Sequence, residues 1–518
     1  MKLCVNVGMA GLALTLALPS SPLSAQTFRT DDPLLRQMWT EGMERSQTAP
    51  LAQALLDSIG PRLSGTEGFY SAVRWLQNRY EEWGVPVRRE QYGTWRGWAS
   101  GILHVDLLSP RVRTLETHLL AWSPGTNGPV EAEVVAVPEF GPGQDVDAWL
   151  ATVRGKAVLI APPQLSCREP QAFERLAREA TVERLSTRQR DVDRSWAERL
   201  TTLGGQNLVS RLEEAGAVAL ISSRWSNGWG VNKVFSAGTE TAVGIDASCE
   251  DYGLLARLAD NGQAPRIRMN AEGEVTGEQP MYNVIAELRG SELPNEYVLL
   301  GAHLDSWHAA SGATDNGTGT IMMLEAMRIL KTVYPNPRRT ILVAHWGGEE
   351  LGLIGSRAFS EDHPEIVENL QAAFNQDNGT WRIDYLQAQG FLDAGGFLAK
   401  WLAQVPEEIS QHIELDVPGP QEQGGSDHMS FICHGVPSFR FQSNYPDYRQ
   451  YTWHTNRDTY DKIVFDDLQN NATLAVMMAY LASEDPQRVP RTRSVLPPGQ
   501  NGQPRQWAQC RQAPRSSN

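Results

Sequence analysis

The sequence predicts a mixed α/β protein in which a largely parallel sheet, flanked by helices, is interrupted by a β-rich insert. Short apolar runs recur in the second half of the chain, and polar residues follow each of them directly. Such runs are typical of buried strands in a parallel sheet, whose connections are helices. Between about residues 123 and 276 the pattern changes to short strands separated by long polar or helical stretches, which predicts the insert.

Residues 1–25 are typical of a signal peptide. Lys2 precedes an apolar core from Val7 to Leu18, and Leu23-Ser24-Ala25 stands before Gln26. The apolar core is shorter than the roughly 20 residues of a membrane span, and no other segment of the sequence approaches that length. The sequence therefore predicts export, either to the periplasm or out of the cell.

Residues 27–125 are predicted to form the first part of the main domain. Ser64 and Glu67 form a capping-box pattern, and apolar residues follow at helical spacing until Gly84. We therefore expect a helix there, with its aromatic stripe in the core. Strands are expected at residues 85–92, 102–108 and 114–120.

Residues 126–276 are predicted to form the insert. Residues 172–212 within it carry both signs of charge at helical spacing, which predicts a solvated helical hairpin. Trp225, Trp229 and Phe235 lie among Gly and Ser in a predicted loop. Packing on the core or on itself is the favoured role of this loop, and a position over a functional site is the alternative. Strands are expected at residues 130–137, 156–160, 217–221 and 243–245.

The most informative stretch begins with Val298–Leu300 and Gly301, which predict a buried strand, and continues with His303 and Asp305. Because side chains alternate along an extended segment, His303 and Asp305 point the same way. A carboxylate beside an imidazole fixes the tautomer and raises the basicity of a metal-binding histidine. A hydrogen-bonded histidine at the end of a strand is the alternative.

The later strands, like this one, are each followed by a carboxylate or an imidazole. An apolar helix over residues 321–330 connects the first two of these strands. Because ligands bind at the carboxyl ends of strands in open α/β sheets, we expect the following side chains to converge at one edge. The strands are predicted at residues 340–344, 372–374 and 438–441, and the side chains are Asp315, Glu349, Glu350, Asp377 and His454.

Oxygen and nitrogen donors of this kind suit a pair of borderline divalent cations such as zinc, with one carboxylate shared between them. Paired cations polarise a carbonyl and activate water for hydrolysis. Glu349 adjoins an expected ligand but points elsewhere, so we expect it to be the general base. A solvated start of a helix is the alternative for Glu349-Glu350 taken alone. The expected metal ligands are His303, Asp315, Glu350, Asp377 and His454.

Five ordered motifs resemble the co-catalytic di-zinc exopeptidase family, which includes bacterial zinc aminopeptidases and plasma glutamate carboxypeptidase (carboxypeptidase Q). The resemblance covers most of residues 277–485, and the number and order of the motifs make it specific. The motifs are HLDSW at 303–307, GATDNG at 312–317, GGEELGLIGS at 347–356, NQDNG at 375–379 and WHTNRDT at 453–459.

The resemblance implies two zinc ions, for which Co²⁺ or Mn²⁺ could substitute. One ion would lie on His303 and Asp377, the other on Glu350 and His454, and Asp315 would bridge them. The substrates implied are small peptides or dipeptides, cleaved at the terminal bond.

The same resemblance assigns further roles. Asp305 would be the carboxylate behind a ligand, Glu349 the base, and the Asp315-Asn316 bond would be cis. The discontinuous segments 27–125 and 277–485 would form the zinc peptidase domain, and the insert at 126–276 resembles a protease-associated domain. Residues 424–428 and 444–451 resemble substrate-facing loops, in which Tyr445, Tyr448 or Tyr451 could stabilise the oxyanion.

Two other functions are compatible with this pattern. A non-catalytic receptor of transferrin-receptor type uses the same domains, but it would be expected to lack ligands or the base, which this chain keeps. A glutaminyl cyclase shares the fold and metal geometry, but as a rule it lacks the insert. The preference for the amino or the carboxyl terminus, the favoured side chain and the oligomeric state stay open.

Composition restricts the partners. A formal net charge of −15 argues against nucleic acid or an anionic membrane as a partner. Beyond the predicted signal peptide the chain has Cys167, Cys249, Cys433 and Cys510, and an exported protein can pair them; Cys167 with Cys249 is favoured because both lie in the insert. A helix is expected at 466–481, and the basic tail, residues 486–518, is expected to be disordered.

Overall fold

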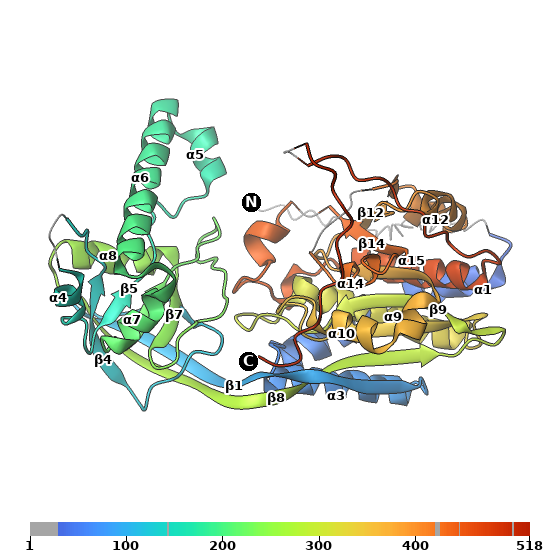
Figure 1. The fold of residues 1–518 in the computed structure, drawn as a ribbon, viewed down its shortest axis with the longest axis horizontal. Coiled ribbons are helices and arrows are strands. Elements are labelled where there is room, and N and C mark those ends of the chain that lie inside the picture. The colour runs from blue at the N-terminus through green and yellow to red at the C-terminus, as the bar shows by residue number, and fades with distance from the viewer. Residues whose placement is uncertain (1–29, 142–144, 420–424, 445, 500–501, 518) are drawn as a thin grey trace, which may run out of the picture.

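The computed structural model describes residues 30–141, 145–419, 425–444, 446–499 and 502–517. The predicted signal peptide lies outside these residues. Two lobes are joined by two long strands that run along the bottom of the molecule in Figure 1. We call residues 113–265 the smaller lobe and the other described residues the larger lobe.

The larger lobe is built on a sheet whose centre is parallel, as predicted. Its strand order is β13-β12-β14-β11-β9-β10-β8, in which β9, β10, β11 and β14 are mutually parallel. β8 is antiparallel to β10, and β12 is antiparallel to β14 but parallel to β13. The bounds are β8 Arg266–Leu288, β9 Leu293–His303, β10 Arg339–Trp346, β11 Leu370–Gln376, β12 Ile383–Gln387, β13 Glu414–Asp416 and β14 Ser438–Ser443.

Helices cover both faces of this sheet. Leu300 and Val343 pack in one core with the helices of one face, while Leu299 and Leu342 pack in another core against Phe359 on the opposite face. Burial on both faces explains why the central strands are continuously apolar. The helices are α1 Pro33–Trp39, α2 Thr48–Gln53, α3 Glu67–Glu82, α9 Thr318–Val333, α10 Ile354–Asp362, α11 Pro364–Glu368, α12 Ala394–Leu402, α13 Glu407–Ser410, α14 Met429–Ile432 and α15 Phe465–Glu484.

The smaller lobe has its own hydrophobic core and a parallel run of strands, β4-β5-β6-β7, that β3 closes in antiparallel fashion. The predicted helical hairpin is present and projects upwards as α5 and α6 in Figure 1. The boundaries 126–276 and the protease-associated identity of the insert remain predictions. The elements are β3 Thr117–Leu119, β4 Val130–Ala136, α4 Val146–Leu150, β5 Ala157–Leu159, α5 Pro170–Leu176, α6 Glu179–Leu203, α7 Leu208–Glu214, β6 Ala219–Ser222, β7 Val243–Ala247 and α8 Cys249–Asp260.

One expectation about the strands was wrong. The separate strands expected at residues 85–92 and 102–108 are parts of one strand, β1 (Val87–Ser109), which also pairs with β2 (Arg113–Thr114). It pairs with β8 along almost its whole length, with register shifts at four places, two of which leave Gly97 and Gly101 unpaired. Bulges of this kind let a ladder continue through residues that interrupt a simple alternation.

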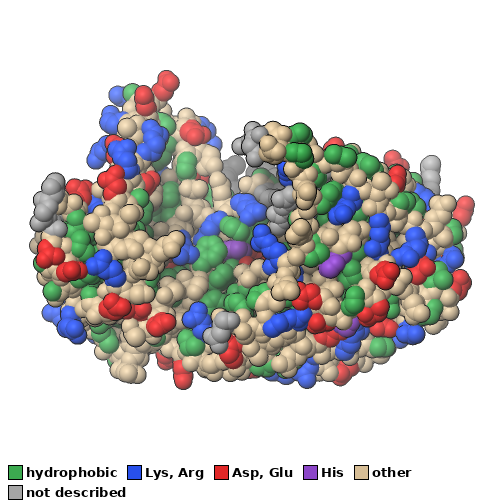
Figure 2. All heavy atoms as spheres, viewed as in Figure 1, with side chains coloured by type: hydrophobic (Ala, Val, Ile, Leu, Met, Phe, Trp, Pro, Cys, Tyr) green, Lys and Arg blue, Asp and Glu red, His purple; other side chains and the backbone are tan. Residues whose placement is uncertain are grey.

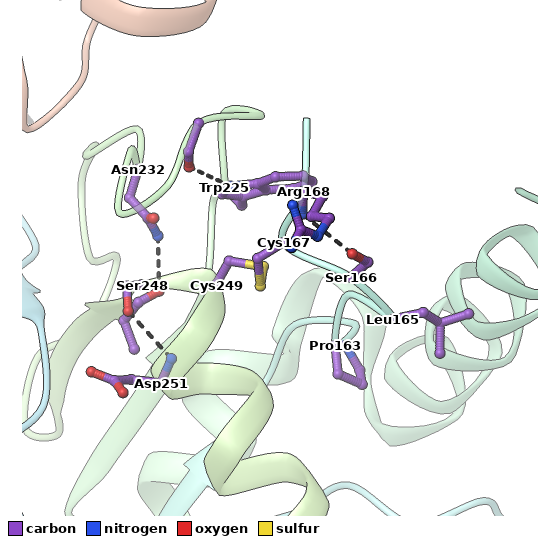
Figure 3. The surroundings of a disulfide bond; sticks show 12 residues. Pro163, Leu165, Ser166, Cys167, Arg168, Trp225, Asn232, Ser248, Cys249 and Asp251 are labelled. Atoms are coloured by element: carbon purple, nitrogen blue, oxygen red, sulfur yellow. Dashed lines mark hydrogen bonds between the residues drawn. A yellow bond between two sulfur atoms is a disulfide. The ribbon is translucent and has the colours of Figure 1, made fainter. Parts of the chain in front are cut away.

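Two disulfides are present among the described residues. The favoured pairing is confirmed, because Cys167 bonds to Cys249 and ties the segment before α5 to the start of α8. Figure 3 places Trp225 and Asn232 close to this bond. The second disulfide joins Cys433 to Cys510 and anchors the C-terminal segment on the larger lobe.

The C-terminal segment differs from the expected disordered tail. Before Cys510, Trp507 donates a hydrogen bond to the carbonyl oxygen of Ser494. Beyond Cys510, Arg515 forms ion pairs with Glu361 and Asp362. The many arginines of this segment predicted a solvated tail, but acidic residues of the larger lobe form ion pairs with Arg515. Among the described residues, no helix combines the length and the apolarity needed to cross a membrane.

Candidate metal centre

The predicted site residues converge at the carboxyl edge of the parallel strands. β9 ends at His303, Glu349 and Glu350 follow the end of β10, and Asp377 follows β11 directly. Connectivity at this edge therefore brings together residues that are far apart in the sequence, as expected. Asp315 lies in the turn before α9, and His454 lies in the loop after the turn Tyr448–Thr452.

The side chains form two groups of three, His303 with Glu349 and Asp377, and Asp315 with Glu350 and His454. In the first group, His303 Nε2 lies 3.2 Å from Asp377 Oδ1. In the second, His454 Nε2 lies 2.9 Å from Glu350 Oε2.

Asp315 reaches both groups with different oxygen atoms. Its Oδ1 lies 3.4 Å from His303 Nε2, and its Oδ2 lies 3.1 Å from His454 Nε2. This is the placement expected for a bridging carboxylate. The cis peptide bond expected between Asp315 and Asn316 is also present.

Asp305 differs in detail from its expected role. The Nδ1 atom of His303 lies 2.9 Å from the backbone oxygen of Asp305, whereas the nearer carboxylate oxygen of Asp305 is 3.7 Å away. The carboxylate instead accepts hydrogen bonds from the backbone N–H groups of Glu349 and Glu350. Asp305 therefore fixes the turn that carries these two glutamates. The turn follows the end of β10, so its backbone N–H groups have no strand partner and are free to donate to Asp305.

Three positioning residues were not assigned to the site by the sequence. Asp458 accepts hydrogen bonds from the backbone N–H groups of Thr314 (2.8 Å) and Asp315 (3.0 Å), and it belongs to the WHTNRDT motif, which was the available signal. Ser64 does not cap the helix as expected: α3 begins after Thr66, and the Ser64 hydroxyl donates to Asp305.

Arg62 is the third of these residues and is completely buried. Its guanidinium donates to the backbone oxygens of Leu304 (2.7 Å) and Gly312 (2.8 Å), so it fixes the loop between His303 and Asp315. Burial lowers the pKa of Arg62 to about 10, against the opposing effect of Asp458 and the site carboxylates, and the group stays charged.

The electrostatics of the site favour bound cations. Burial opposes protonation of His303, yet Asp377 and Glu349 raise its pKa well above the usual value. Burial raises the pKa of Glu350 to about 7, and Asp315 contributes in the same direction. Asp315 Oδ2 and Glu350 Oε1 are buried without a hydrogen-bond partner among the described residues. Clustered carboxylates and imidazoles with unsatisfied oxygen atoms are a donor set that fits zinc.

Glu349 belongs to the first group but is set back from it, with Oε2 3.9 Å from His303 Nε2. Burial raises its pKa well above the usual value, while His303 lowers it and Asp377 raises it further. A buried carboxyl group with a raised pKa beside a candidate metal site is typical of a general base.

A cavity of 350 Å³ opens over the candidate ligands. Tyr448, Arg357, Arg440, Arg449 and Trp453 also line it. Figure 2 shows Lys and Arg side chains beside a histidine in the hollow between the lobes. A second cavity of 410 Å³ adjoins it at Tyr448 and is lined by Trp229 and Trp381.

The two predicted substrate-facing loops are only partly at the cavity. Gly425 lines it, but Ser426, Asp427 and His428 are buried, because the chain turns there into α14. In the other loop, Tyr448 lines the cavity, and the Tyr451 hydroxyl donates to Glu169 at 3.0 Å. Gly424 and Tyr445 lie outside the described residues.

The fold and this site together define a mixed α/β protein with a candidate paired-cation centre at the carboxyl edge of its sheet. Residues 283–479 match the family model described as Peptidase family M28. The resemblance predicted from the five motifs is thereby confirmed, and the enzyme class that these similarities support is a metallo-exopeptidase.

Similarity extends beyond the matched domain. The chain is 25% identical to carboxypeptidase Q of Mus musculus over 449 residues, which is 85% of this chain and 86% of the relative. It is 24% identical to carboxypeptidase Q of Homo sapiens over 85% of each chain.

Solved structures share the fold. A peptidase M28 precursor from Shewanella amazonensis has a TM-score of 0.63 at 24% identity, covering 90% of this chain and 98% of its own. The zinc aminopeptidase of Bacillus subtilis has a TM-score of 0.54 at 20% identity, covering 86% of this chain and 96% of its own. The predicted fold class, a mixed and largely parallel sheet flanked by helices, is confirmed.

Proposed function

We propose that the chain is an exported di-zinc metallo-exopeptidase that hydrolyses the terminal peptide bond of small peptides or dipeptides. The observation that carries this proposal is the position of Asp315, whose two oxygen atoms face the two separate groups of candidate ligands. A carboxylate placed in this way is suited to two cations held close together.

Each candidate ligand has a place in this proposal. His303 and Asp377 would hold one zinc ion, Glu350 and His454 the other, and Asp315 both. Bound zinc would supply polarisation of the scissile carbonyl and a lowered pKa for the attacking water.

Glu349 lies beside the candidate ligands without belonging to the expected set of five. It would accept the proton of the attacking water and return it to the leaving amine, a role for which its burial and raised pKa are suited. The Tyr448 side chain lines the same cavity and is the tyrosine best placed to donate to the developing oxyanion.

Arg357 and Arg449 favour a substrate with a free carboxylate. Both line the cavity, and neither forms an ion pair with the residues that the structure describes. Arg449 instead lies over the Trp453 ring, 4.4 Å from its centroid. Two divalent cations would balance the ligand carboxylates and Glu349, so the two guanidinium groups would leave the loaded cavity positive.

Export rests on separate observations. Residues 1–25 have the pattern of a signal peptide. The two disulfides fit an oxidising compartment. The proposed compartment is the periplasm or the extracellular medium.

The test is a profile of amino acids released from a panel of free, N-blocked and C-amidated dipeptides by the metal-free protein with and without added zinc. We expect zinc-dependent release of free amino acids and a large loss of activity on C-amidated substrates. Arg449→Met should raise KM for the free dipeptide and leave KM for the amidated one unchanged. Formation of pyroglutamate would favour a cyclase, and zinc binding without any hydrolysis would favour a receptor.

A further inference from the structure

The two candidate histidine ligands are oriented by different parts of the molecule. His303 is completely buried, and its Nδ1 atom has the Asp305 backbone oxygen as a partner at 2.9 Å. His454 Nδ1 is buried but has no hydrogen-bond partner among the described residues. Metal-binding histidines are usually oriented by a hydrogen bond from the second ring nitrogen, so the orientation of His454 requires another source.

The smaller lobe clamps the backbone around His454. The Val234 N–H donates to the His454 carbonyl oxygen at 2.9 Å, and Lys233 forms an antiparallel bridge with Thr455. His454 has a φ of 59°, a left-handed conformation that is costly for a residue with a side chain and persists where neighbours hold it. The clamp therefore acts at a residue whose backbone needs support.

Asn456 extends this clamp with its side chain. Its Oδ1 accepts from the Asn232 N–H at 2.9 Å, and its Nδ2 donates to the Gly230 carbonyl oxygen at 2.9 Å. The Asn456 N–H in turn donates to the Asn232 carbonyl oxygen at 3.0 Å. Asn456 is therefore held on both its backbone and its side chain by one loop of the smaller lobe.

That loop is itself anchored in the core of the smaller lobe. Asn232 Nδ2 donates to Asp246 Oδ1 and, at 2.8 Å, to the Ala247 carbonyl oxygen. Asp246 is completely buried and also accepts from the Ser222 hydroxyl at 2.8 Å. A continuous set of hydrogen bonds thus runs from β7 to the loop that carries His454.

Aromatic rings enclose the imidazole of His454. The Phe235 ring lies edge-on to it at a centroid distance of 5.2 Å, and the Trp453 ring stacks on it at 3.9 Å. Phe235 also packs against Trp307 at 5.2 Å. Phe235 belongs to the smaller lobe, so this lobe restricts the ring of His454 as well as its backbone.

We propose that the smaller lobe completes the second half of the metal centre, with Asn456 and Phe235 as positioning residues for His454. This inference rests on the proposed di-zinc function. Its consequence is that the two halves depend differently on contact between the lobes: loss of the clamp weakens the Glu350–His454 half and spares the His303–Asp377 half.

The test is zinc titration of the metal-free full chain in competition with a chromophoric chelator, together with the absorption spectrum of the cobalt-loaded protein. Wild type is expected to bind two ions per chain. Asn456→Ala and Phe235→Leu are expected to lower the affinity of one ion by about 10–100-fold, the usual effect of removing a group that orients a ligand, and to leave the other unchanged. The cobalt spectrum of the weakened half should change with it.

Two controls separate positioning from general damage. Glu116→Gln removes the ion pair between Glu116 and Arg457, which joins the same lobes without touching His454, and it should leave both affinities unchanged. In a His454→Ala background, Asn456→Ala should cause no further loss, since its target is already gone.

The outcomes are distinct. Wild type that binds fewer than two ions would overturn the proposed function. Two results would overturn the positioning role if wild type binds two ions. In the first, both variants bind two ions as tightly as wild type; in the second, both variants lose affinity equally in the two halves. If one of the two variants does not melt cooperatively without metal, the other variant carries the test. If neither variant folds while the His454→Ala protein does, the role of Asn456 and Phe235 is purely structural.

Discussion

The His303 half and the His454 half of the candidate metal centre contain similar side chains but are supported differently. His303 lies at the end of a central strand, its carbonyl oxygen accepts from the Thr320 hydroxyl at 2.8 Å, and its ring is oriented by Asp305. His454 lies in a loop, and its supports come from residues 230–235 of the other lobe.

This difference teaches how a fold divides the task of building one site. The rigid strand ends provide fixed positions, which a buried sheet holds with little freedom. The loop provides a position that depends on docking between lobes. Movement of one lobe against the other would therefore disturb one half of the centre before the other.

The largest expected effect comes from Glu349, which is outside the expected ligand set of either half. Glu349→Gln should lower kcat by about 10²–10⁴-fold and leave the metal content unchanged, because the proposed general base is lost but no proposed ligand is. Steady-state kinetics and metal analysis of the same preparation measure the two quantities. Glu350→Gln is the matched control and should lose metal; metal loss from the Glu349 variant instead would mean that the two roles are exchanged.

Asp458 offers a way to weaken both halves together. It positions Asp315, which faces both groups, so Asp458→Asn should lower the affinity of both ions by about 10–100-fold. Chelator competition would measure both affinities. A loss confined to one half would contradict the shared role of Asp315, and Asn456→Ala supplies the comparison with a one-sided effect.

The titration of Asp246, which anchors the loop that supports His454, should make the stability of the protein depend on pH. Burial raises its pKa to about 6, although Asn232 and Ser222 oppose this. The folded protein therefore holds the proton to a higher pH than the unfolded chain, and stability is lost as pH rises from about 4 to about 6.

We expect this loss to be about 3 kcal/mol and to be absent in Asp246→Asn. Urea unfolding of the metal-free protein at several pH values measures it. Equal slopes in wild type and variant over this range would show that another group is responsible.

The smallest effect concerns an ion pair confined to the larger lobe. His363 Nε2 lies 3.1 Å from Glu90 Oε2, and this hydrogen bond raises the pKa of His363 above 6.5, against the effect of partial burial. The pair stabilises the fold below pH 6.5, and its contribution disappears as pH rises through the raised pKa.

His363→Gln should therefore cost about 0.5 kcal/mol at pH 5.5 and nothing at pH 9. Urea unfolding measures this cost, in a pH range above that of Asp246, so the contributions of the two lobes can be separated. A cost that is independent of pH would indicate lost packing instead of a lost ion pair.

The sequence by itself determined the central parallel strands and which side chains gather at their carboxyl edge. Apolar runs followed by polar residues fix strand ends, and parallel connectivity places the residues after β9, β10 and β11 at one edge whatever their separation in the chain. The position of Asp315 between the two groups of side chains and the Cys167–Cys249 pairing were also within reach, from motif order and from shared location in the insert.

Only the tertiary structure decided which groups hold these residues in place. Asp305 contacts the glutamate turn through its carboxylate, Asp458 orients Asp315, and Arg515 binds acidic residues of the larger lobe. Val234 bonds to His454, and Asn232 to Asn456, because two lobes dock, and no local pattern encodes those contacts. Periodicity reports which face of an element is buried, whereas the partner of a polar group depends on how distant segments are brought together, and that is settled only when the chain has folded.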